Sequence, residues 1–293
     1  MAAEDFIICN EGIKVSGNRM LETLSNDRGF EVFNTDKISN TVCEFRDMNS
    51  DRETFFKSKR YKIEKAIYEV EKDGSKCEFG KEREGSYVMS VIKDSGENII
   101  LETSDNCKEV FFGGSYDRDL LHFATWMAFS LAVLPKKIVS LHASSIIYQG
   151  RAVLFLGESG TGKSTHSRLW QENIPEVRLL NDDSPFIRAD GSEVVAFGSP
   201  WSGKTHCYIN ESFPVAACVR LSQAPYNEIR RLDTLKAFGA LHPSCPPAFA
   251  YDDYLYDFVS DFLSNLLSKI PVFHMEALPD SDAVETVFKA VFE

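Results

Sequence analysis

Short stretches of alternating hydrophobic and polar residues fill the first part of the chain. Turn sequences rich in glycine, serine and aspartate separate these stretches. An alternation of period two places every second side chain on the same face of a strand, so it favours β-structure. We therefore predict an antiparallel meander whose strands include residues 66–70, 86–92, 98–103 and 109–112.

One longer apolar segment follows, from Tyr116 to Leu134. Its large side chains cover most of the circumference of a helix, which favours a helix that is buried by its surroundings. The most apolar part is shorter than the ~20 residues that span a bilayer, and Pro135 closes it. We predict a buried connecting helix at 116–136, between a β-rich (α+β) N-terminal domain at 1–115 and a second domain at 137–293.

Beyond residue 137 the pattern changes to an alternation of strands and helices, which is typical of an α/β domain. Strands are predicted at 138–148, 152–156, 177–180, 194–197 and 214–221, with a last one that starts at Pro271. Helices are predicted at 163–172, 232–241, 251–270 and 282–292.

The strand predicted at 152–156 runs directly into the segment Gly157-Glu158-Ser159-Gly160-Thr161-Gly162-Lys163-Ser164-Thr165. This segment matches G-x-x-x-x-G-K-[ST] between a strand and a helix, the context in which the pattern binds a nucleoside triphosphate. Glycines let backbone N–H groups turn toward phosphate oxygens, Lys163 adds a positive charge, and the hydroxyl of Ser164 is a ligand for Mg²⁺. The helix that begins here points the positive end of its dipole at the same anion. We therefore predict that residues 157–165 bind a nucleoside triphosphate with Mg²⁺.

Two adjacent carboxylates, Asp182 and Asp183, end the next predicted strand. P-loop enzymes place a carboxylate that orders Mg²⁺ at the end of such a strand, and a second carboxylate there can take the proton of an acceptor hydroxyl. The strand begins soon after the helix of the phosphate-binding loop, as a β–α–β order requires. The alternative is a simple turn, which the composition of residues 182–185 permits.

Charge and cysteine content narrow the range of partners. Forty-four acidic and 32 basic residues give a formal net charge of −12, which repels nucleic acid and anionic membranes, so neither is an expected partner. Seven cysteines without a C-x-x-C pair predict reduced thiols and a cytoplasmic location. The first residues lack the basic and apolar regions of a leader, so no signal peptide is expected.

Four segments occur together in the second domain: Leu141-His142-Ala143-Ser144, the loop at 157–165, Asn181-Asp182-Asp183, and residues 198–204. In this combination, the chain resembles the catalytic domain of HPr kinase/phosphorylase and, more closely, stand-alone HPr-kinase-like proteins of bacteria. The resemblance covers about residues 137–293. It implies a mixed-sheet P-loop fold like that of phosphoenolpyruvate carboxykinase, and transfer of a phosphoryl group from ATP to a serine-type hydroxyl.

The resemblance also implies roles for single residues. Lys163 would neutralise the transferred phosphate, and Ser164 would hold Mg²⁺. Asp182 matches the general base of the family, and Asp183 would help to hold Mg²⁺ or to orient its waters. The reverse division between the two carboxylates is the alternative.

Two further residues receive a role in the same way. His142 matches a family histidine that reaches the phosphate, and the alternative is a histidine whose hydrogen bonds are satisfied in a buried strand. Lys204 would contact the phosphate or the acceptor, in a loop where Trp201 shapes the pocket. The alternative is a surface lysine beside a packed tryptophan.

The acceptor that the sequence predicts is a peptide or protein bearing a serine. HPr itself is not expected, because residues 186–195 do not match the Glu-Ile-Arg-Gly signature that follows the aspartates in HPr kinase. The N-terminal domain is expected to dock the substrate or to form a homo-oligomer. Two alternatives remain open: a kinase for a small metabolite, and a regulatory protein that responds to a nucleotide without transferring phosphate.

Overall fold

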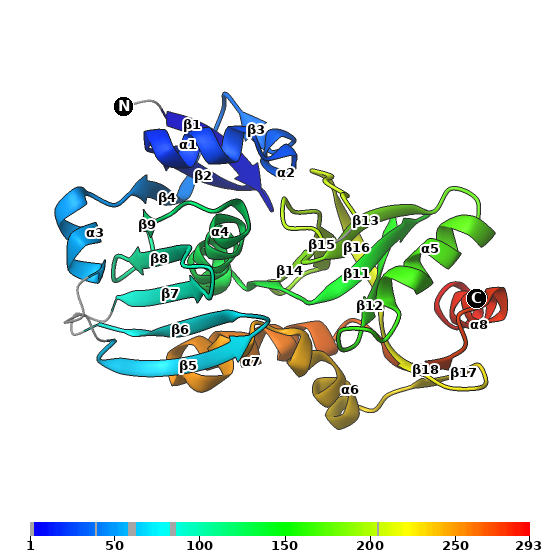
Figure 1. Cartoon of the computed structure of the whole chain (residues 1–293). Coiled ribbons are helices and arrows are strands. Elements are labelled where there is room, and N and C mark those ends of the chain that lie inside the picture. Colours follow the sequence, from blue (N-terminus) through cyan, green and yellow to red (C-terminus); the bar gives the residue numbers. More distant parts are fainter. Residues whose placement is uncertain (1–2, 39, 58–62, 83–85, 204) are drawn as a thin grey trace. The chain divides into compact units, whose positions relative to one another are not determined.

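The computed structural model describes residues 3–38, 40–57, 63–82, 86–203 and 205–293. The chain divides into two compact units, Met1–Val133 and Leu134–Glu293. Each unit combines helices with a mixed sheet, so the fold class is mixed α/β (Figure 1).

The first unit contains most of the short strands. Its strands are β1 (Ala3–Ile8), β2 (Glu11–Ser16), β3 (Asn34–Thr35), β4 (Thr41–Asp47), β5 (Lys65–Lys72), β6 (Ser75–Lys81), β7 (Tyr87–Lys93), β8 (Asn98–Thr103) and β9 (Glu109–Gly114). Its helices are α1 (Asn18–Ser25), α2 (Arg28–Glu31), α3 (Ser50–Lys57) and α4 (Arg118–Val133). The strands follow the order β3-β1-β2-β4-β9-β8-β7-β6-β5.

The predicted meander is confirmed: β5 to β9 are antiparallel neighbours in sequence order. Prediction from the pattern missed β6, where the alternation of polar and apolar residues is interrupted by Gly80. It also missed the parallel pairs β2–β4 and β4–β9, which continue the sheet beyond the meander. The predicted buried helix corresponds to α4, whose apolar side chains are largely inaccessible to solvent.

The second unit holds the glycine-rich segment at 157–165, which the sequence predicts to bind a nucleoside triphosphate. Its strands are β10 (Ile138–Ser140), β11 (Ala143–Tyr148), β12 (Arg151–Leu156), β13 (Arg178–Asp183), β14 (Phe186–Ala189), β15 (Val194–Phe197), β16 (Ser212–Gln223), β17 (Glu228–Arg231) and β18 (Val272–Ala277). Its helices are α5 (Lys163–Asn173), α6 (Thr234–Leu241), α7 (Asp253–Leu267) and α8 (Ser281–Phe292), with 3₁₀ turns at η1 (Leu134–Lys136), η2 (His242–Ser244) and η3 (Pro247–Tyr251).

Strand order decides where the acidic pair lies. The sheet runs β10-β14-β15-β16-β12-β11-β13, and β18 pairs with β16 and β17. The prediction that β13 follows β12 as the next strand of a β–α–β unit is therefore wrong in one respect: β11 lies between them and is antiparallel to both. Because β12 and β13 both run opposite to β11, their carboxyl ends flank the start of β11 (Figure 1).

A two-residue turn sets the register of β11 on β12. Gln149 and Gly150 both adopt positive φ, at 48° and 72°. This is the backbone that a type I′ hairpin turn requires, and glycine adopts it without strain. The turn pairs Tyr148 with Arg151 and, at the far end of the hairpin, Ala143 with Leu156.

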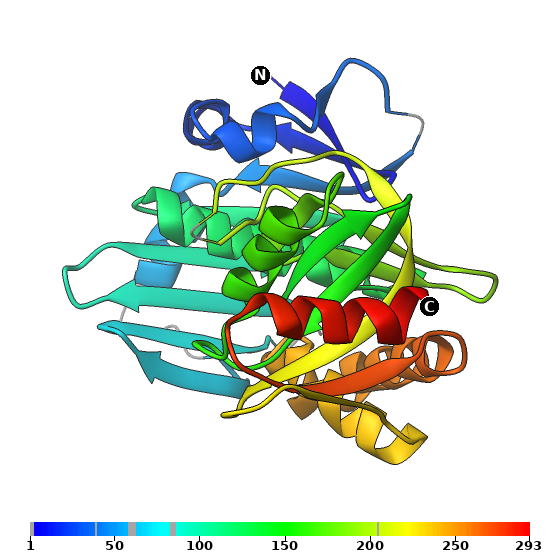
Figure 2. The same ribbon diagram turned by 90° about the vertical axis from the view of Figure 1, so that its right-hand side faces the viewer.

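The core of the second unit lies between the sheet and the pair of helices α5 and α8, which lie side by side (Figure 2). Val153 and Phe155 of β12 face this core together with Trp170 of α5. The intervening residues of β12 are also buried, which explains why this strand reads as a continuous apolar run.

Several bounds and elements differ from the prediction. The strand predicted at 138–148 is broken into β10 and β11 at Leu141-His142. The predicted helix at 251–270 begins at Asp253, because the Asp252 side chain accepts a hydrogen bond from the N–H of Leu255 and so caps the helix. β14 and β17 were not predicted, since each has only four residues. In the described part of the chain, no helix combines the length and the apolarity that crossing a membrane takes.

Candidate active site

The segment that follows β12 forms an open loop around the start of α5. Gly157 has φ +148°, and a Cβ there would lie 2.5 Å from Oγ1 of Thr161. Gly160 and Gly162 also have positive φ, and no atom lies within 4 Å of the position that a Cβ would take. Gly162 is the N-cap of α5 and supplies no side-chain hydrogen bond to the first turn. The loop therefore brings the uncapped end of a helix to an open surface.

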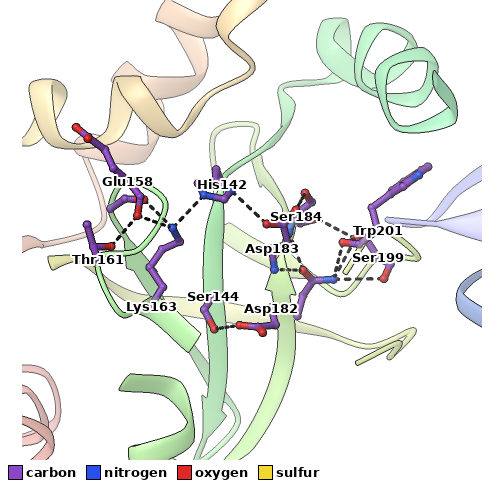
Figure 3. Close-up of polar contacts among 12 residues, drawn as sticks. His142, Ser144, Glu158, Thr161, Lys163, Asp182, Asp183, Ser184, Ser199 and Trp201 are labelled. Carbon is purple, nitrogen blue, oxygen red and sulfur yellow. Dashed lines mark hydrogen bonds and ion pairs between the residues drawn. The ribbon is translucent and has the colours of Figure 1, made fainter. Parts of the chain in front are cut away.

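Lys163 is held inside this loop. Its ammonium lies 2.8 Å from the carbonyl oxygen of Gly157, 3.1 Å from that of Glu158 and 3.0 Å from Nε2 of His142 (Figure 3). These contacts use all three N–H donors of the ammonium. Burial lowers the pKa of Lys163, and the nearby Asp183 carboxylate opposes this effect. These three contacts thus fix the position of the Lys163 ammonium in the loop.

His142 connects the loop to the acidic pair. It stands just before β11, where its backbone N–H donates to the carbonyl of Ser244, and its Nδ1 lies 3.3 Å from Oδ1 of Asp183. A lysine ammonium can only donate, so the Nε2 of His142 that faces Lys163 must accept. The neutral ring therefore carries its proton on Nδ1 and donates it to Asp183.

Asp183 is partly open to solvent, with 42% of its side chain exposed. Burial acts to raise its pKa, but the hydrogen bonds from His142 and Ser184 and the charge of Lys163 outweigh burial, so the pKa lies below its ordinary value. The hydroxyl of Ser184 donates to Oδ2 at 3.0 Å. The carboxylate is therefore ionised at neutral pH and is accessible from outside.

Replacing His142 with alanine is expected to raise the pKa of Asp183, because burial remains while the hydrogen bond is lost. In the wild type the lowered pKa stabilises the folded state above the unfolded carboxyl pKa of about 4, and this contribution disappears as the pH falls through the folded pKa. In His142→Ala this contribution should be smaller, and its loss should be complete at a higher pH.

The measurement is a carboxyl ¹³C titration of Asp183 together with melting temperatures between about pH 2 and 6. His206→Ala, at another exposed histidine, is the matched control. An Asp183 titration that is the same with and without His142 contradicts the assigned hydrogen bond.

Asp182 points to a different set of partners. It is 6% exposed, and its Oδ1 accepts a hydrogen bond of 2.8 Å from Ser144, whose hydroxyl lies 2.6 Å from that of Ser167 on α5. Asp182 also lines a cavity of about 360 Å³ together with Ser164. Successive residues of a strand point to opposite faces, so the two neighbouring carboxylates serve different surroundings.

A second loop closes over the acidic pair. The side-chain amide of Asn181 donates to the carbonyls of Ser199 and Trp201, while its oxygen accepts from the N–H groups of Asp183 and Ser184. Trp201 is buried, and its ring packs against that of Phe186 at 5.5 Å. One amide thus fixes the loop and the acidic segment to each other (Figure 3).

Gly203 lies where that loop approaches β13. A Cβ at this position would lie 2.7 Å from the carbonyl oxygen of Asp182 and 3.2 Å from Cβ of Asp183. Because the first of these atoms is backbone, Gly203→Ala is expected to cost about 1–3 kcal/mol of unfolding free energy. Urea denaturation measures this. Gly239→Ala is the matched control, since no atom lies within 4 Å there and alanine favours α6. Equal stability of the two variants would contradict the close approach.

No protein-family model matches the chain, and no curated protein matches it either. Among solved structures, the chain is similar to the Hpr(Ser) kinase/phosphatase from Coxiella burnetii, with 12% sequence identity and a TM-score of 0.31. The match covers 52% of this chain and 94% of that one.

The predicted site residues fall into two groups. Lys163, His142 and Asp183 form one connected chain of contacts, and Ser164 shares a cavity with Asp182. The side chains of Glu158 and Ser159 are exposed on the loop. The prediction for Lys204 falls on a residue outside the described part of the chain. Of the described residues, no three histidine, cysteine or carboxylate side chains gather as a metal site would require.

Sequence reasoning did not place three neighbours of the site, Ser144, Ser167 and Arg220. Ser144 and Ser167 have no motif of their own, although Ser144 stands directly opposite Asp182 in the β11–β13 register. Arg220 stands opposite Leu156 in β16, and its guanidinium lies 3.7 Å from the Glu158 carboxylate. A correct strand order would have identified both Ser144 and Arg220 as close neighbours.

Proposed function

We propose that this chain is a Mg²⁺-dependent kinase that transfers the γ-phosphoryl group of ATP to a serine-type hydroxyl of a peptide or protein. The observation that carries the proposal is the contact chain Lys163–His142–Asp183. It joins the cation of a phosphate-binding loop to an accessible, ionised carboxylate. Phosphoryl transfer needs these two groups close together, because catalysis consists mainly of positioning and charge neutralisation.

The loop fits a triphosphate. The first turn of α5 is uncapped by side chains, and the open glycines at 160 and 162 leave room for phosphate oxygens beside the backbone. Lys163 supplies the positive charge. Mg²⁺ also fits, because this ion is held by one or two protein oxygens while phosphate and water provide the rest. A dedicated cluster of protein ligands is not needed.

We assign the proton-accepting role to Asp183 and the metal-binding role to Asp182, which reverses the division that the resemblance implies. Asp183 is accessible, and its neighbour His142 touches the loop lysine. Asp182 is buried and lines one cavity with Ser164, the residue whose hydroxyl is a metal ligand in such loops. The surroundings of the two carboxylates therefore support Asp183 as the base and Asp182 as the metal ligand.

In the proposed reaction Asp183 orients the acceptor hydroxyl and takes its proton. His142 holds this carboxylate in place by donating from Nδ1, and Lys163 neutralises charge on the transferred group. Bound MgATP supplies that group: a bond forms between the acceptor oxygen and the γ-phosphorus while the bond to the leaving oxygen of ADP breaks. Ser144 holds the Asp182 carboxylate by a hydrogen bond, and Ser167 of α5 contacts Ser144 in turn.

The experiment is transfer from ATP labelled at the γ-phosphate, with Mg²⁺, to a library of serine-containing peptides and to a cell extract. We expect label in phosphoserine with the wild type and no such label with Lys163→Ala. Label confined to small molecules would identify a metabolite kinase instead. Tight ATP binding without any transfer would identify a nucleotide-responsive protein and refute the kinase proposal.

A further inference from the structure

A groove of about 150 Å³ opens on the second unit beside α7, among the residues of η2 and η3. Prolines and other apolar residues form most of its wall, including Pro243, Pro247, Ala250 and Val259, together with the ring of Tyr251. An apolar space of this volume accepts a molecule as large as benzene. One large apolar side chain of another molecule therefore fits this groove, which we call the η3 groove.

Two exposed tyrosines accompany the η3 groove. Tyr251 in its wall is 64% exposed, and Tyr254 in the first turn of α7 is 58% exposed. The ring of Tyr254 lies edge-on against that of Phe258, with 5.1 Å between the ring centroids. Single exposed apolar residues are common, but exposed aromatic rings beside an apolar groove are typical of a surface that binds a protein or peptide.

The η3 groove and the candidate active site share one segment of the chain. Pro243 and Cys245 line the groove. The residue between them, Ser244, accepts a hydrogen bond of 2.7 Å at its carbonyl oxygen from the backbone N–H of His142. The ring of the same histidine contacts Lys163 and Asp183. A molecule held in the groove therefore binds to the segment that supports this histidine.

The first turns of α7 add negative charge next to these tyrosines. Asp253, Asp257 and Asp261 are exposed, and their spacing of four residues places them along one face of the helix, which we call the acidic row. Tyr254 is three residues from Asp257 and therefore lies beside it. The chain has no lysine or arginine between Lys236 and Lys269. The partner that complements this face is positively charged.

We propose that the η3 groove and the acidic row dock the acceptor peptide by an apolar side chain followed by basic residues. This inference rests on the proposed function and specifies the class of its acceptor. The apolar side chain enters the groove beside Tyr251, and the basic side chains pair with Asp253 and Asp257. A second copy of this chain suits the surface less well, because a symmetric contact would bring two acidic rows together.

The test measures binding of two fluorescein-labelled peptides to the full chain by anisotropy, without nucleotide. Both contain a phenylalanine and a serine. In one peptide three lysines or arginines follow the phenylalanine, and in the other glutamates replace them. The basic peptide should bind about tenfold more tightly at low salt, and added salt should reduce the difference, because exposed charges are screened. Equal binding, or tighter binding of the acidic peptide, would overturn the proposal.

Two variants test the two parts of the surface. Asp257→Lys should weaken binding of the basic peptide about fivefold, because one attraction becomes a repulsion. Ala250→Trp fills the η3 groove and should weaken both peptides about tenfold, since the phenylalanine loses its site. Asp190→Lys makes the same charge change at an exposed aspartate after β14 and is the matched control. Unchanged affinities in both groove and row variants would overturn the assignment.

Phosphoryl transfer with MgATP separates this docking surface from the proposed function. Asp257→Lys should raise the KM for the basic peptide about fivefold and leave kcat and the KM for ATP unchanged. Binding of the basic peptide by a chain that phosphorylates none of the peptides would refute the kinase proposal and leave the docking surface intact. Equal transfer to basic and acidic peptides would do the reverse. A wild-type dimer that Ala250→Trp dissociates in sedimentation would identify a second copy as the occupant and overturn the inference.

Discussion

Lys163→Ala is expected to lower ATP-dependent phosphoryl transfer on the order of 10³-fold, the loss typical of removing one preorganised charge from a transition state. The lysine has no substitute in the loop, because no other cation lies within the described loop residues 157–165. Its ammonium is held by two loop carbonyls and by His142. Initial rates with labelled ATP measure the effect.

Lys289→Ala is the matched control for this variant. Lys289 is an exposed lysine of α8 that pairs with Glu285, so its loss should leave the transfer rate unchanged. Circular dichroism would show that both variants are folded. Transfer by Lys163→Ala at the wild-type rate would mean that the loop does not bind the transferred phosphate.

Asp183→Asn is expected to reduce transfer by about 10²–10⁴-fold while ATP binding persists, because the amide cannot take the proton of the acceptor. Asp190→Asn, at an exposed aspartate after β14, is the matched control. Rates at saturating ATP, with ATP affinity measured separately, distinguish a lost base from lost binding.

The corresponding change at Asp182 separates the two carboxylates. If Asp182 helps to hold Mg²⁺, then Asp182→Asn should raise the Mg²⁺ concentration needed for half-maximal rate, and excess Mg²⁺ should restore part of the activity. Asp183→Asn should not respond to excess Mg²⁺. Metal rescue of Asp183→Asn alone would return the base role to Asp182.

The local elements of the second unit were largely predictable from the sequence. Val153 to Leu156 is a buried apolar run, and Gly162 before Lys163 marks the start of a helix, so β12 and α5 were found near their true bounds. Local pattern is sufficient here because burial and capping act on neighbouring residues.

The arrangement of the site could not be predicted in the same way. β11 lies between β12 and β13 because it pairs with residues that are distant in the sequence. Such pairing does not change the local periodicity of hydrophobic residues. For the same reason the contact of Ser144 with Asp182 was not found. His142 was identified only through a resemblance, since its role depends on the break that separates β10 from β11.

The hairpin turn at Gln149 and Gly150 has a consequence for the chemistry at the opposite end of β11. Six residues of strand, about 20 Å at ~3.3 Å per residue, separate this turn from His142. A slip of one residue in the hairpin would invert every side chain of the strand, turning Ser144 away from Asp182 and shifting the imidazole off the lysine. The spacing of the Lys163 ammonium, the imidazole and the Asp183 carboxylate therefore depends on an exposed turn at the far end of the hairpin.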